Sequence, residues 1–306
     1  GVPVAKAGHA LLGGAVDQPG PDSAWHGSLS VRALPWLAEH KVGGAMVLPG
    51  TAYLDMALAA ADGGTVADMA LKRLLLVPGD GAVPLHSIVR RDADGGGHLS
   101  IHAKGDGGWT LHAQARLSAS PVPIRPDRAL APVMARCPAL LDAGDYYAAA
   151  ARTGVELGPG FRVLSDIRMG AGEVLARLSP LPAIAAGRGH RIHPALLDGG
   201  LQALALAALH GKDGGAPHVP VAVDSLSATG TMTDAAWVHA LARPDEGDPV
   251  GDVSLLDDNG RVLAALEGVR FQRLDGGADA ELANWLYRLN WQSLPLPGAA
   301  RRLGVW

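Results

Sequence analysis

A histidine, a Pro-Gly pair and an apolar run follow one another in the first part of this chain. His40 comes shortly before Pro49 and Gly50, and residues 51–60 then read as a helix rich in Ala and Leu, without a helix breaker. Imidazole titrates near neutral pH and can act as a general base, whereas the first N–H groups of a helix can hydrogen-bond a carbonyl or an anion. The spacing therefore predicts that a base and a helix N-terminus are aimed at one substrate.

A second apolar helix is predicted over residues 194–210, with proline in its first turn and glycine after its end. It carries Asp198, which is costly in an apolar helix unless it is hydrogen-bonded or functional. Gln202 follows one helical turn later and so lies on the same face. Residues 52–55 (Ala-Tyr-Leu-Asp) match residues 195–198 (Ala-Leu-Leu-Asp), which suggests an internal duplication.

The rest of the chain predicts antiparallel strands. Gly/Asp-rich clusters separate short β-type runs, and an Asp-Asn-Gly turn at 258–260 marks a hairpin. A helix is predicted over 142–153, and the proline-rich stretch 119–138 is predicted to be a connection without helix or central strand. The predicted strands are residues 70–77, 85–91, 98–104, 109–117, 161–170, 173–178, 219–228, 237–242 and the two arms of 253–273.

Length, charge and cysteine content narrow the class of protein. The 306 residues can bury one large core or two fused small ones. A formal net charge of -4, from 26 basic and 30 acidic residues, indicates binding to neither nucleic acid nor an anionic membrane. The single cysteine, Cys137, cannot form an internal disulfide, and the sequence shows no signal peptide or sustained apolar span. We therefore expect a cytoplasmic protein cut from a larger polypeptide.

Three motifs, in order, carry a resemblance to a known family. His40, Gly44 and Pro49 fit the pattern H-x3-G-x4-P, residues 154–161 resemble a GYxYGPxF element, and residues 193–202 resemble an HPALLD/DxxxQ element. Each match is weak by itself, because short motifs recur by chance. Together they resemble the dehydratase domains of modular polyketide synthases.

The flanking segments agree with this resemblance. Residues 9–13 are similar to the family's opening segment, and residues 286–291 to the region that leads into the next synthase domain. The resemblance implies a double hot-dog fold of class α+β, in which each of two fused halves wraps an antiparallel sheet around a central helix. The expected division is an N-terminal half at 1–130 with the catalytic histidine, a C-terminal half at 131–275 with the catalytic aspartate, and a linker at 276–306.

The resemblance also implies a reaction and partners. The expected reaction is loss of water from a 3-hydroxyacyl thioester to give the 2,3-enoyl thioester during polyketide chain elongation. The substrate is expected on the phosphopantetheine arm of an acyl carrier protein, and the domain itself is expected to bind no cofactor and no metal. Expected partners are the acyl carrier protein, neighbouring synthase domains and, in a homodimer, a second copy of the chain.

Dehydration needs a base for the α-proton and an acid for the hydroxyl leaving group. We expect His40 to be the base and Asp198 the acid, since a carboxyl group that an apolar pocket keeps protonated can donate a proton. Gln202 is expected to orient the Asp198 carboxyl, and the Gly50 N–H to stabilise the enolate-like charge on the thioester carbonyl. The expected substrate-binding residues are Pro49, Tyr53, Leu157, Gly158, Pro159 and Phe161.

Two other site interpretations rank lower. Asp55 is a rival for the acid role because it lies on the helix that follows His40, but the family that the chain resembles takes its acid from the second half. His98, His102 and His112 could be imagined as a metal site, but no carboxylate or cysteine completes the set.

Two positions depart from the family pattern. Val155 and Leu157 stand where GYxYGPxF has tyrosines, although the turn at 158–161 is kept. We therefore expect the wall of the substrate site to lack its usual hydroxyl. Two alternatives stay open: a bifunctional dehydratase and cyclase that forms a pyran or furan ring by oxa-Michael addition, and an inactive scaffold or docking domain. Retention of His40 and Asp198 argues against the inactive domain.

Overall fold

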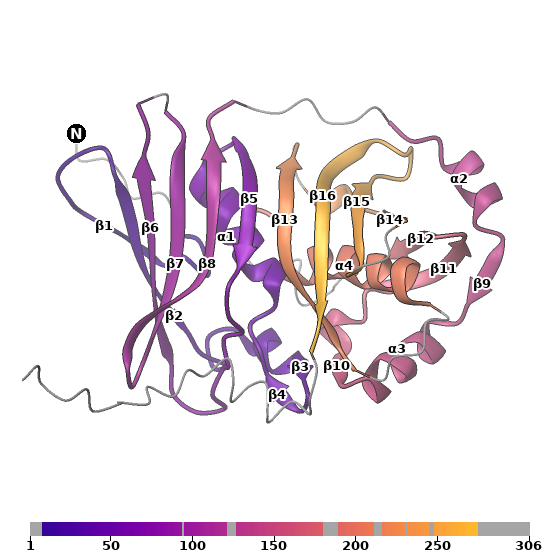
Figure 1. Cartoon of the computed structure of the whole chain (residues 1–306), viewed down its shortest axis with the longest axis horizontal. Coiled ribbons are helices and arrows are strands. Elements are labelled where there is room, and N and C mark those ends of the chain that lie inside the picture. The colour runs from indigo at the N-terminus through magenta and orange to yellow at the C-terminus, as the bar shows by residue number, and fades with distance from the viewer. Residues whose placement is uncertain are drawn as a thin grey trace, which may run out of the picture.

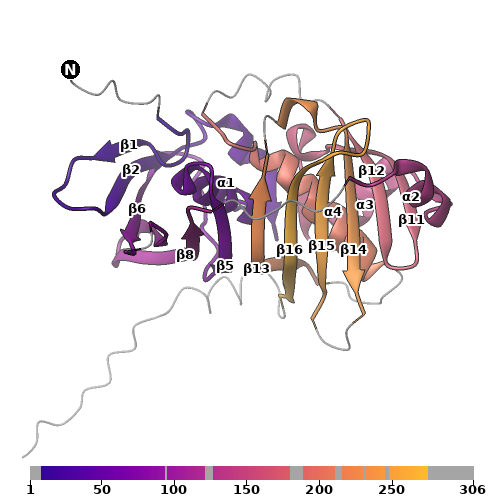
Figure 2. The same cartoon turned by 90° about the horizontal axis from the view of Figure 1, so that it is seen from above.

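The computed structural model of this chain describes residues 8–93, 95–120, 127–179, 189–210, 216–229, 232–244 and 248–274. Within these residues the strands pair antiparallel and form a 13-stranded sheet and a separate three-stranded sheet. Figure 1 and Figure 2 show the large sheet bent into two halves, each of which wraps around one helix. This is the double hot-dog architecture of class α+β that the sequence predicts.

The first half of the sheet surrounds helix α1 (Gly50–Ala61). Ten of the 12 residues of α1 are buried, because the helix packs against protein on nearly every side. The strands present alternate side chains to α1, so that Leu99, Ile101 and Ala103 of β7 point into the core. In order across the sheet these strands are β1 (Gly14–Val16), β2 (Ser23–Leu29), β6 (Val83–Arg91), β7 (Gly97–Gly105), β8 (Gly108–Ser118) and β5 (Thr65–Leu71).

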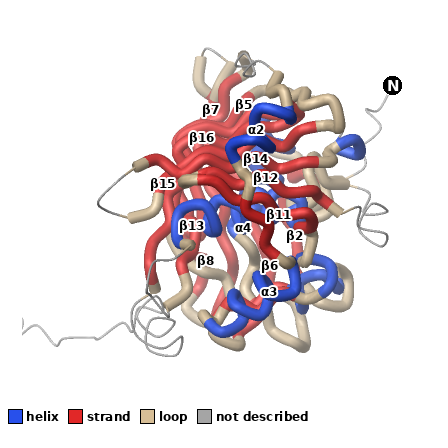
Figure 3. Tube along the Cα trace, turned by 90° about the vertical axis from the view of Figure 1, so that its right-hand side faces the viewer, coloured by secondary structure: helices blue, strands red, loops and turns tan. Residues whose placement is uncertain are grey.

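The second half surrounds helix α4 (Pro194–Leu209), of whose 16 residues 12 are buried. No helix in the described ranges combines the length and apolarity needed to cross a bilayer. Two further helices, α2 (Leu130–Arg136) and α3 (Ala143–Arg152), lie at the outer end of this half (Figure 1; Figure 3). Its strands, in order, are β13 (His218–Ala228), β16 (Val262–Arg273), β15 (Val250–Leu256), β14 (Trp237–Arg243), β12 (Glu173–Leu178), β11 (Leu164–Gly170) and β9 (Ala139–Leu141).

The two halves share one sheet and one core. Strands β5 and β13 pair at the middle of the large sheet, where Met69 lies opposite Val223. Helix α1 contacts α4 across the same junction, and most of the buried apolar residues of the two halves form one cluster, with two smaller clusters beside it. The three-stranded sheet and the short 3-10 helices complete the fold: β10 (Val155–Leu157), β3 (His40–Val42), β4 (Ala45–Met46), η1 (Pro35–Glu39), η2 (Pro159–Phe161) and η3 (Met232–Asp234).

Some local predictions are wrong, and the structure shows why. Of the strand expected over residues 70–77, only residues 70 and 71 belong to β5, which begins at Thr65, because the Leu75 carbonyl and the Val77 N–H bond to the segment before α1 instead. The stretch 119–138 contains α2, since Pro132 stands in its first turn, where a missing N–H leaves no helical bond unmade.

Other boundaries differ or fall outside the described ranges. The strand expected over 161–170 begins at Leu164, because Phe161 belongs to η2. Strands β1 to β4 were not predicted, because β1, β3 and β4 have three residues or fewer and the burial of the seven-residue β2 does not alternate regularly. The predicted boundary between residues 130 and 131 lies at the start of α2 and stays a prediction, and the predicted linker at 276–306 lies outside the described residues.

Two glycines allow α4 to lie close to the sheet. A Cβ atom on Gly199 would lie 2.6 Å from Val163 Cγ2, and one on Gly200 would lie 2.7 Å from Val253 Cγ1. Both distances are shorter than van der Waals contact. The separation between α4 and its sheet therefore depends on the absence of side chains at these positions.

We predict that Gly200→Val destabilises the protein by about 1–3 kcal/mol, because the added side chain overpacks the α4–β15 contact and outweighs any gain in helix propensity. Urea unfolding followed by circular dichroism measures the difference. Gly14→Val is the matched control, because a Cβ at Gly14 meets no atom within 4 Å. Equal stability of the two variants would show that the packing of α4 is loose at this position.

Candidate active site

The small sheet joins two motifs that lie far apart in the sequence. Strand β10 pairs with β3 so that Leu157 lies opposite His40. The pairing is extended at both ends, because the Gly43 N–H donates to the Gly154 carbonyl at 2.7 Å and the Gly158 N–H donates to the Glu39 carbonyl at 2.7 Å. The histidine of the first half is therefore held against the glycine-rich turn of the second half.

The contacts of His40 leave one ring nitrogen free to act as a base. Its Nδ1 lies 3.0 Å from the Val47 carbonyl oxygen. Because a carbonyl only accepts hydrogen bonds, Nδ1 must donate, and the neutral ring then carries its lone pair on Nε2. The ring is buried beside Phe161, with the ring centroids 5.2 Å apart.

The Nε2 atom of His40 faces the carboxyl group of Asp198 on α4. The distance from Nε2 to Asp198 Oδ1 is 4.0 Å, which is too long for a direct hydrogen bond. Asp198 is 7% exposed. Burial raises the pKa of Asp198 above its usual value, although His40 and the hydrogen bond from Gln202 oppose the rise. The lone pair on His40 Nε2 therefore lies next to the Asp198 carboxyl group, which holds its proton more tightly than usual.

Gln202 orients this carboxyl group through a chain of hydrogen bonds that starts at the backbone. The Leu164 N–H donates to the Tyr147 hydroxyl at 2.9 Å, and that hydroxyl donates to Gln202 Oε1 at 3.1 Å. The amide of Gln202 can then only present its Nε2 to Asp198 Oδ2, at 2.8 Å, and to the Phe161 carbonyl, at 2.9 Å. The orientation of the amide is thus determined by a peptide N–H.

The start of α1 lies at the same site. Helix α1 begins at Gly50 after Pro49, its N-cap. The Ala52 N–H donates to the Pro49 carbonyl at 2.9 Å, whereas the N–H groups of Gly50 and Thr51 have no acceptor within the helix. A Cβ at residue 50 would lie 2.7 Å from Leu71 Cδ1 and 3.0 Å from Pro220 Cγ. Glycine therefore lets the positive end of the helix dipole come close to the site.

A cavity of about 490 Å³ connects these groups. Six of the predicted residues line it: His40, Gly50, Tyr53, Leu157, Asp198 and Gln202. The other four, Pro49, Gly158, Pro159 and Phe161, are not among the described residues that line the cavity. Of these four, Phe161 supports the wall from behind, because its ring is fully buried and its carbonyl accepts from Gln202 Nε2.

Two lining residues make the wall largely apolar. Leu157 is 6% exposed and offers no hydrogen-bonding group. The Tyr53 ring also lines the cavity, but its hydroxyl is buried and has no hydrogen-bond partner among the described residues. Burial raises the pKa of Tyr53, so the phenol stays neutral. The wall beside His40 therefore lacks the hydroxyl at residue 157, as the sequence predicts.

Asp55, the rival carboxyl group, lies outside this cavity among the described residues. Burial by itself would raise the pKa of Asp55, but hydrogen bonds from His190 and His9 outweigh this and hold the pKa below its usual value. Asp55 therefore stays ionised and has no proton to donate. This environment favours Asp198 as the acid.

The three histidines that could have formed a metal site do not converge. His98 is exposed and lies 3.6 Å from Asp92 Oδ2, whereas His112 is buried on β8 with its Nδ1 3.2 Å from the Arg73 carbonyl. His102 lies on β7 opposite His86 of β6. The His/Cys/Asp/Glu group that is compact enough for a metal ion, within the described ranges, is a different one, formed by His9, Asp55 and His190.

Sequence reasoning missed several residues of the site. Tyr147 was predicted to be helical, but nothing in the pattern identified Gln202 as the partner of its hydroxyl. Arg73, Asp248 and Arg273 also line the cavity. They come from separate segments without a shared motif, so only the fold brings them together.

Comparison with known families gives matches along both halves of the chain. Residues 9–104 match the family described as "Polyketide synthase dehydratase domain", and residues 125–281 match "Polyketide synthase dehydratase N-terminal domain". A similar solved structure is the dehydratase domain of a mycocerosic acid synthase-like polyketide synthase, with a TM-score of 0.80 and 26% identity over 87% of this chain and 97% of that chain. The double hot-dog fold is thus shared with dehydratase domains.

Curated relatives are much longer proteins. Mycoketide-CoA synthase of Mycobacterium tuberculosis is 30% identical over 98% of this chain. A mycocerosic acid synthase-like polyketide synthase of the same species is 30% identical over 97% of this chain. The chain spans only 7% and 15% of the lengths of these two proteins.

We predict that Tyr147→Phe costs about 1–3 kcal/mol of stability, because it leaves the Leu164 N–H and Gln202 Oε1 buried without their shared partner. Chemical unfolding measures the loss. Tyr146→Phe is the matched control, since the Tyr146 hydroxyl makes only a 3.4 Å contact with the Gln202 carbonyl. A larger loss in the control would contradict the orienting chain.

We also predict a pH-dependent stability difference for Asp198→Asn. Because the pKa of Asp198 is raised in the folded state, the folded protein binds more protons than the unfolded chain above the usual value of 3.8, and stability falls as the pH rises through the raised pKa. The amide of asparagine does not titrate, so the variant does not lose this stability as the pH rises. Urea unfolding between pH 4 and pH 8 should therefore show the variant gaining stability relative to the wild type as the pH rises, and a constant difference would contradict the raised pKa.

Proposed function

Because the chain belongs to the polyketide synthase dehydratase domains, we propose that it removes water from a 3-hydroxyacyl thioester carried on an acyl carrier protein and releases the 2,3-enoyl thioester. The observation that carries this proposal is the position of His40 Nε2, 4.0 Å from the buried Asp198 carboxyl at the cavity. A base and an acid at this spacing can act on adjacent carbons of one substrate.

In the proposed reaction His40 removes the α-proton. The Nε2 lone pair takes this proton because Nδ1 is committed to the Val47 carbonyl. Negative charge then develops on the thioester oxygen, where the Gly50 N–H at the start of α1 stabilises it. This stabilisation is needed because the α-proton of a thioester is only weakly acidic.

Asp198 completes the reaction as the acid. Gln202 donates to Oδ2, so the proton of the carboxyl group belongs on Oδ1, the oxygen nearer to His40. Transfer of this proton to the β-hydroxyl lets the C–O bond break with release of water, while the C–H electron pair becomes the new double bond. Return of the proton from the His40 imidazolium to the Asp198 carboxylate, through the product water, restores both groups.

The apolar wall supports an acyl chain as the substrate. The Leu157 side chain and the Tyr53 ring present hydrocarbon surface next to His40. Such a wall binds a chain by burial of apolar area. The acyl carrier protein and the neighbouring synthase domains are proposed as partners because the relatives are multidomain synthases.

We predict that His40→Ala and Asp198→Asn each lower kcat for a synthetic 3-hydroxyacyl pantetheine thioester by about 10²–10⁴-fold, the usual contribution of a general acid or base. Mass spectrometry of the enoyl product measures turnover. His98→Ala is the matched control, because the same change is made at an exposed histidine of β7. Full turnover by either folded site variant would remove that residue from the mechanism.

The same assay separates the alternatives. No turnover by the wild-type protein on substrates of several lengths would favour an inactive scaffold. A substrate with both a 3-hydroxyl and a distal hydroxyl tests for the cyclase. Ring formation that is lost in His40→Ala would show that the protein is a cyclase as well as a dehydratase. Ring closure at the rate seen in buffer leaves a plain dehydratase.

A further inference from the structure

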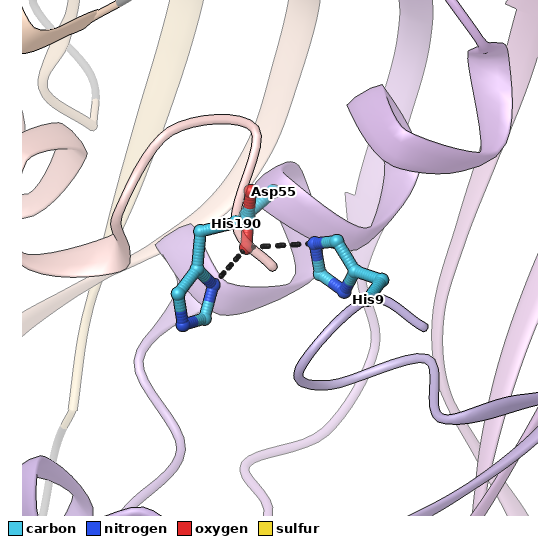
Figure 4. Close-up of side chains that lie close together, drawn as sticks. All are labelled: His9, Asp55 and His190. Carbon is cyan, nitrogen blue, oxygen red and sulfur yellow. Dashed lines mark hydrogen bonds and ion pairs between the residues drawn. The ribbon is translucent and has the colours of Figure 1, made fainter. Parts of the chain in front are cut away.

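A second group of titratable side chains lies away from the cavity, around Asp55. Figure 4 shows His9 and His190 pointing toward Asp55 from different segments of the chain. The same carboxylate oxygen, Oδ2, lies 3.0 Å from His9 Nε2 and 2.5 Å from His190 Nδ1. The Asp55 side chain is 0% exposed.

The other carboxylate oxygen of Asp55 is also satisfied. Oδ1 accepts from the Arg191 N–H at 2.8 Å and from the Ile192 N–H at 3.0 Å. Three hydrogen bonds and the close contact of His9 Nε2 therefore surround one buried carboxylate. Replacing any of them leaves a charged group with fewer partners in an apolar core, which is costly.

The tautomer of His9 argues against a metal ion at this group. His9 Nδ1 lies 3.2 Å from the Leu11 N–H and 3.2 Å from the Leu12 N–H, so it must accept from them. The neutral ring then carries its proton on Nε2, which faces Asp55. A metal ligand would need a lone pair on Nε2, with Nδ1 as a donor to its surroundings. The group is therefore a hydrogen-bonded carboxylate rather than a metal site.

Asp55 connects α1 to the segment that precedes α4. It belongs to α1 of the first half, whereas its backbone donors lie in the segment that leads directly into α4 of the second half. His193 follows this segment as the N-cap of α4, with its Nδ1 accepting from the Ala195 N–H at 3.1 Å. Burial and the nearby His190 lower the pKa of His193 to about 3, so the ring stays neutral and can accept. The first turn of α4 is thus held to α1 through Asp55.

The same group reaches His40 through packed rings. The His190 ring lies 6.1 Å from Trp36, and Trp36 lies 5.6 Å from His193 and 6.1 Å from Phe161, measured between centroids. Phe161 in turn lies 5.2 Å from His40. Displacement of the His190 segment would therefore shift residues on both sides of the cavity, His40 on one side and α4 on the other.

We propose that Asp55 is a positioning residue, which holds the start of α4 against α1 and thereby sets the distance between His40 and Asp198. This inference rests on the proposed dehydration, because it concerns the geometry of that base and that acid. Asp55 acts without touching the substrate. A displacement of about 1 Å between reacting groups can cost on the order of 10²-fold in rate, so a distant clamp can matter to catalysis.

We predict that Asp55→Asn lowers kcat for the 3-hydroxyacyl pantetheine thioester by about 10–100-fold, with KM changed by less than about threefold. The amide oxygen can still accept from Arg191 and Ile192, but the amide nitrogen then faces the His9 Nε2–H, a donor against a donor. Initial rates at a temperature where the variant is fully folded, checked by circular dichroism, measure the effect.

Glu173→Gln is the matched control for loss of stability alone. Glu173 is another buried carboxylate with a histidine partner, 2.7 Å from His239 Nε2 and 2.6 Å from Arg136 Nη2, but it lies in the second half outside the described cavity lining. Its loss is expected to lower the melting temperature and to leave kcat of the folded enzyme unchanged. An equal fall of kcat in this control would assign the Asp55 effect to general destabilisation and overturn the proposal.

A second pair of variants tests the clamp if Asp55→Asn does not fold. His190→Leu removes one donor to Asp55, whereas His190→Asn can return an N–H close to the position of Nδ1. We expect a lower kcat in the first and a recovery toward wild type in the second. Equal kcat values in these two variants would contradict the clamp.

Asp198→Asn, assayed in parallel, separates this proposal from the proposed function. If Asp198→Asn is inactive while Asp55→Asn and His190→Leu keep the wild-type kcat, the positioning role fails and the dehydration mechanism stands. If Asp198→Asn keeps full activity, the mechanism itself fails, and the positioning role with it.

Discussion

The pairing of β3 with β10 is the interaction on which the candidate site depends. It places His40 opposite Leu157, and so brings the base of the first half against the glycine-rich turn of the second half. The backbone bonds of Gly43 and Gly158 hold both ends of this pairing. Without it, the short segment that carries the base would lose its backbone hydrogen bonds to the half that carries the acid.

Two aspartates at matching places in the two central helices show how surroundings determine chemistry. Asp55 accepts three hydrogen bonds, lies 3.0 Å from His9 Nε2 and stays ionised, because these contacts offset the cost of burial. Asp198 accepts a hydrogen bond from Gln202 Nε2 and lies 4.0 Å from His40 Nε2, but burial outweighs both of these contacts, so its pKa rises. The same residue type thus provides a structural anion in one half and a proton donor for the proposed reaction in the other.

The site also shows how a buried polar network can be fixed by the backbone. The peptide N–H of Leu164 determines the direction of the Tyr147 hydroxyl, which determines the orientation of the Gln202 amide. That amide in turn leaves Asp198 Oδ1 as the oxygen free to carry a proton toward the cavity. Because each step has only one donor pattern available, the network specifies a single arrangement.

The sequence by itself determined the buried helices, the antiparallel strands and the motifs around His40, residues 154–161 and Asp198. These features depend on local periodicity, on turn residues and on short spacings, all of which can be read along one stretch of chain. The double hot-dog fold followed from the resemblance of those motifs to a known family, and it was confirmed.

Only the tertiary structure decided which groups meet. The contacts of Asp55 with His9 and His190, and of Tyr147 with Gln202, join residues more than 40 positions apart in the chain. No local pattern records such pairs, because they arise from the way the two halves pack. For the same reason the ionisation of Asp55 could not be assigned from sequence, and the protonated Asp198 was expected only through the family resemblance: a carboxyl group's pKa depends on the donors and the burial around it, and these are supplied by other segments of the fold.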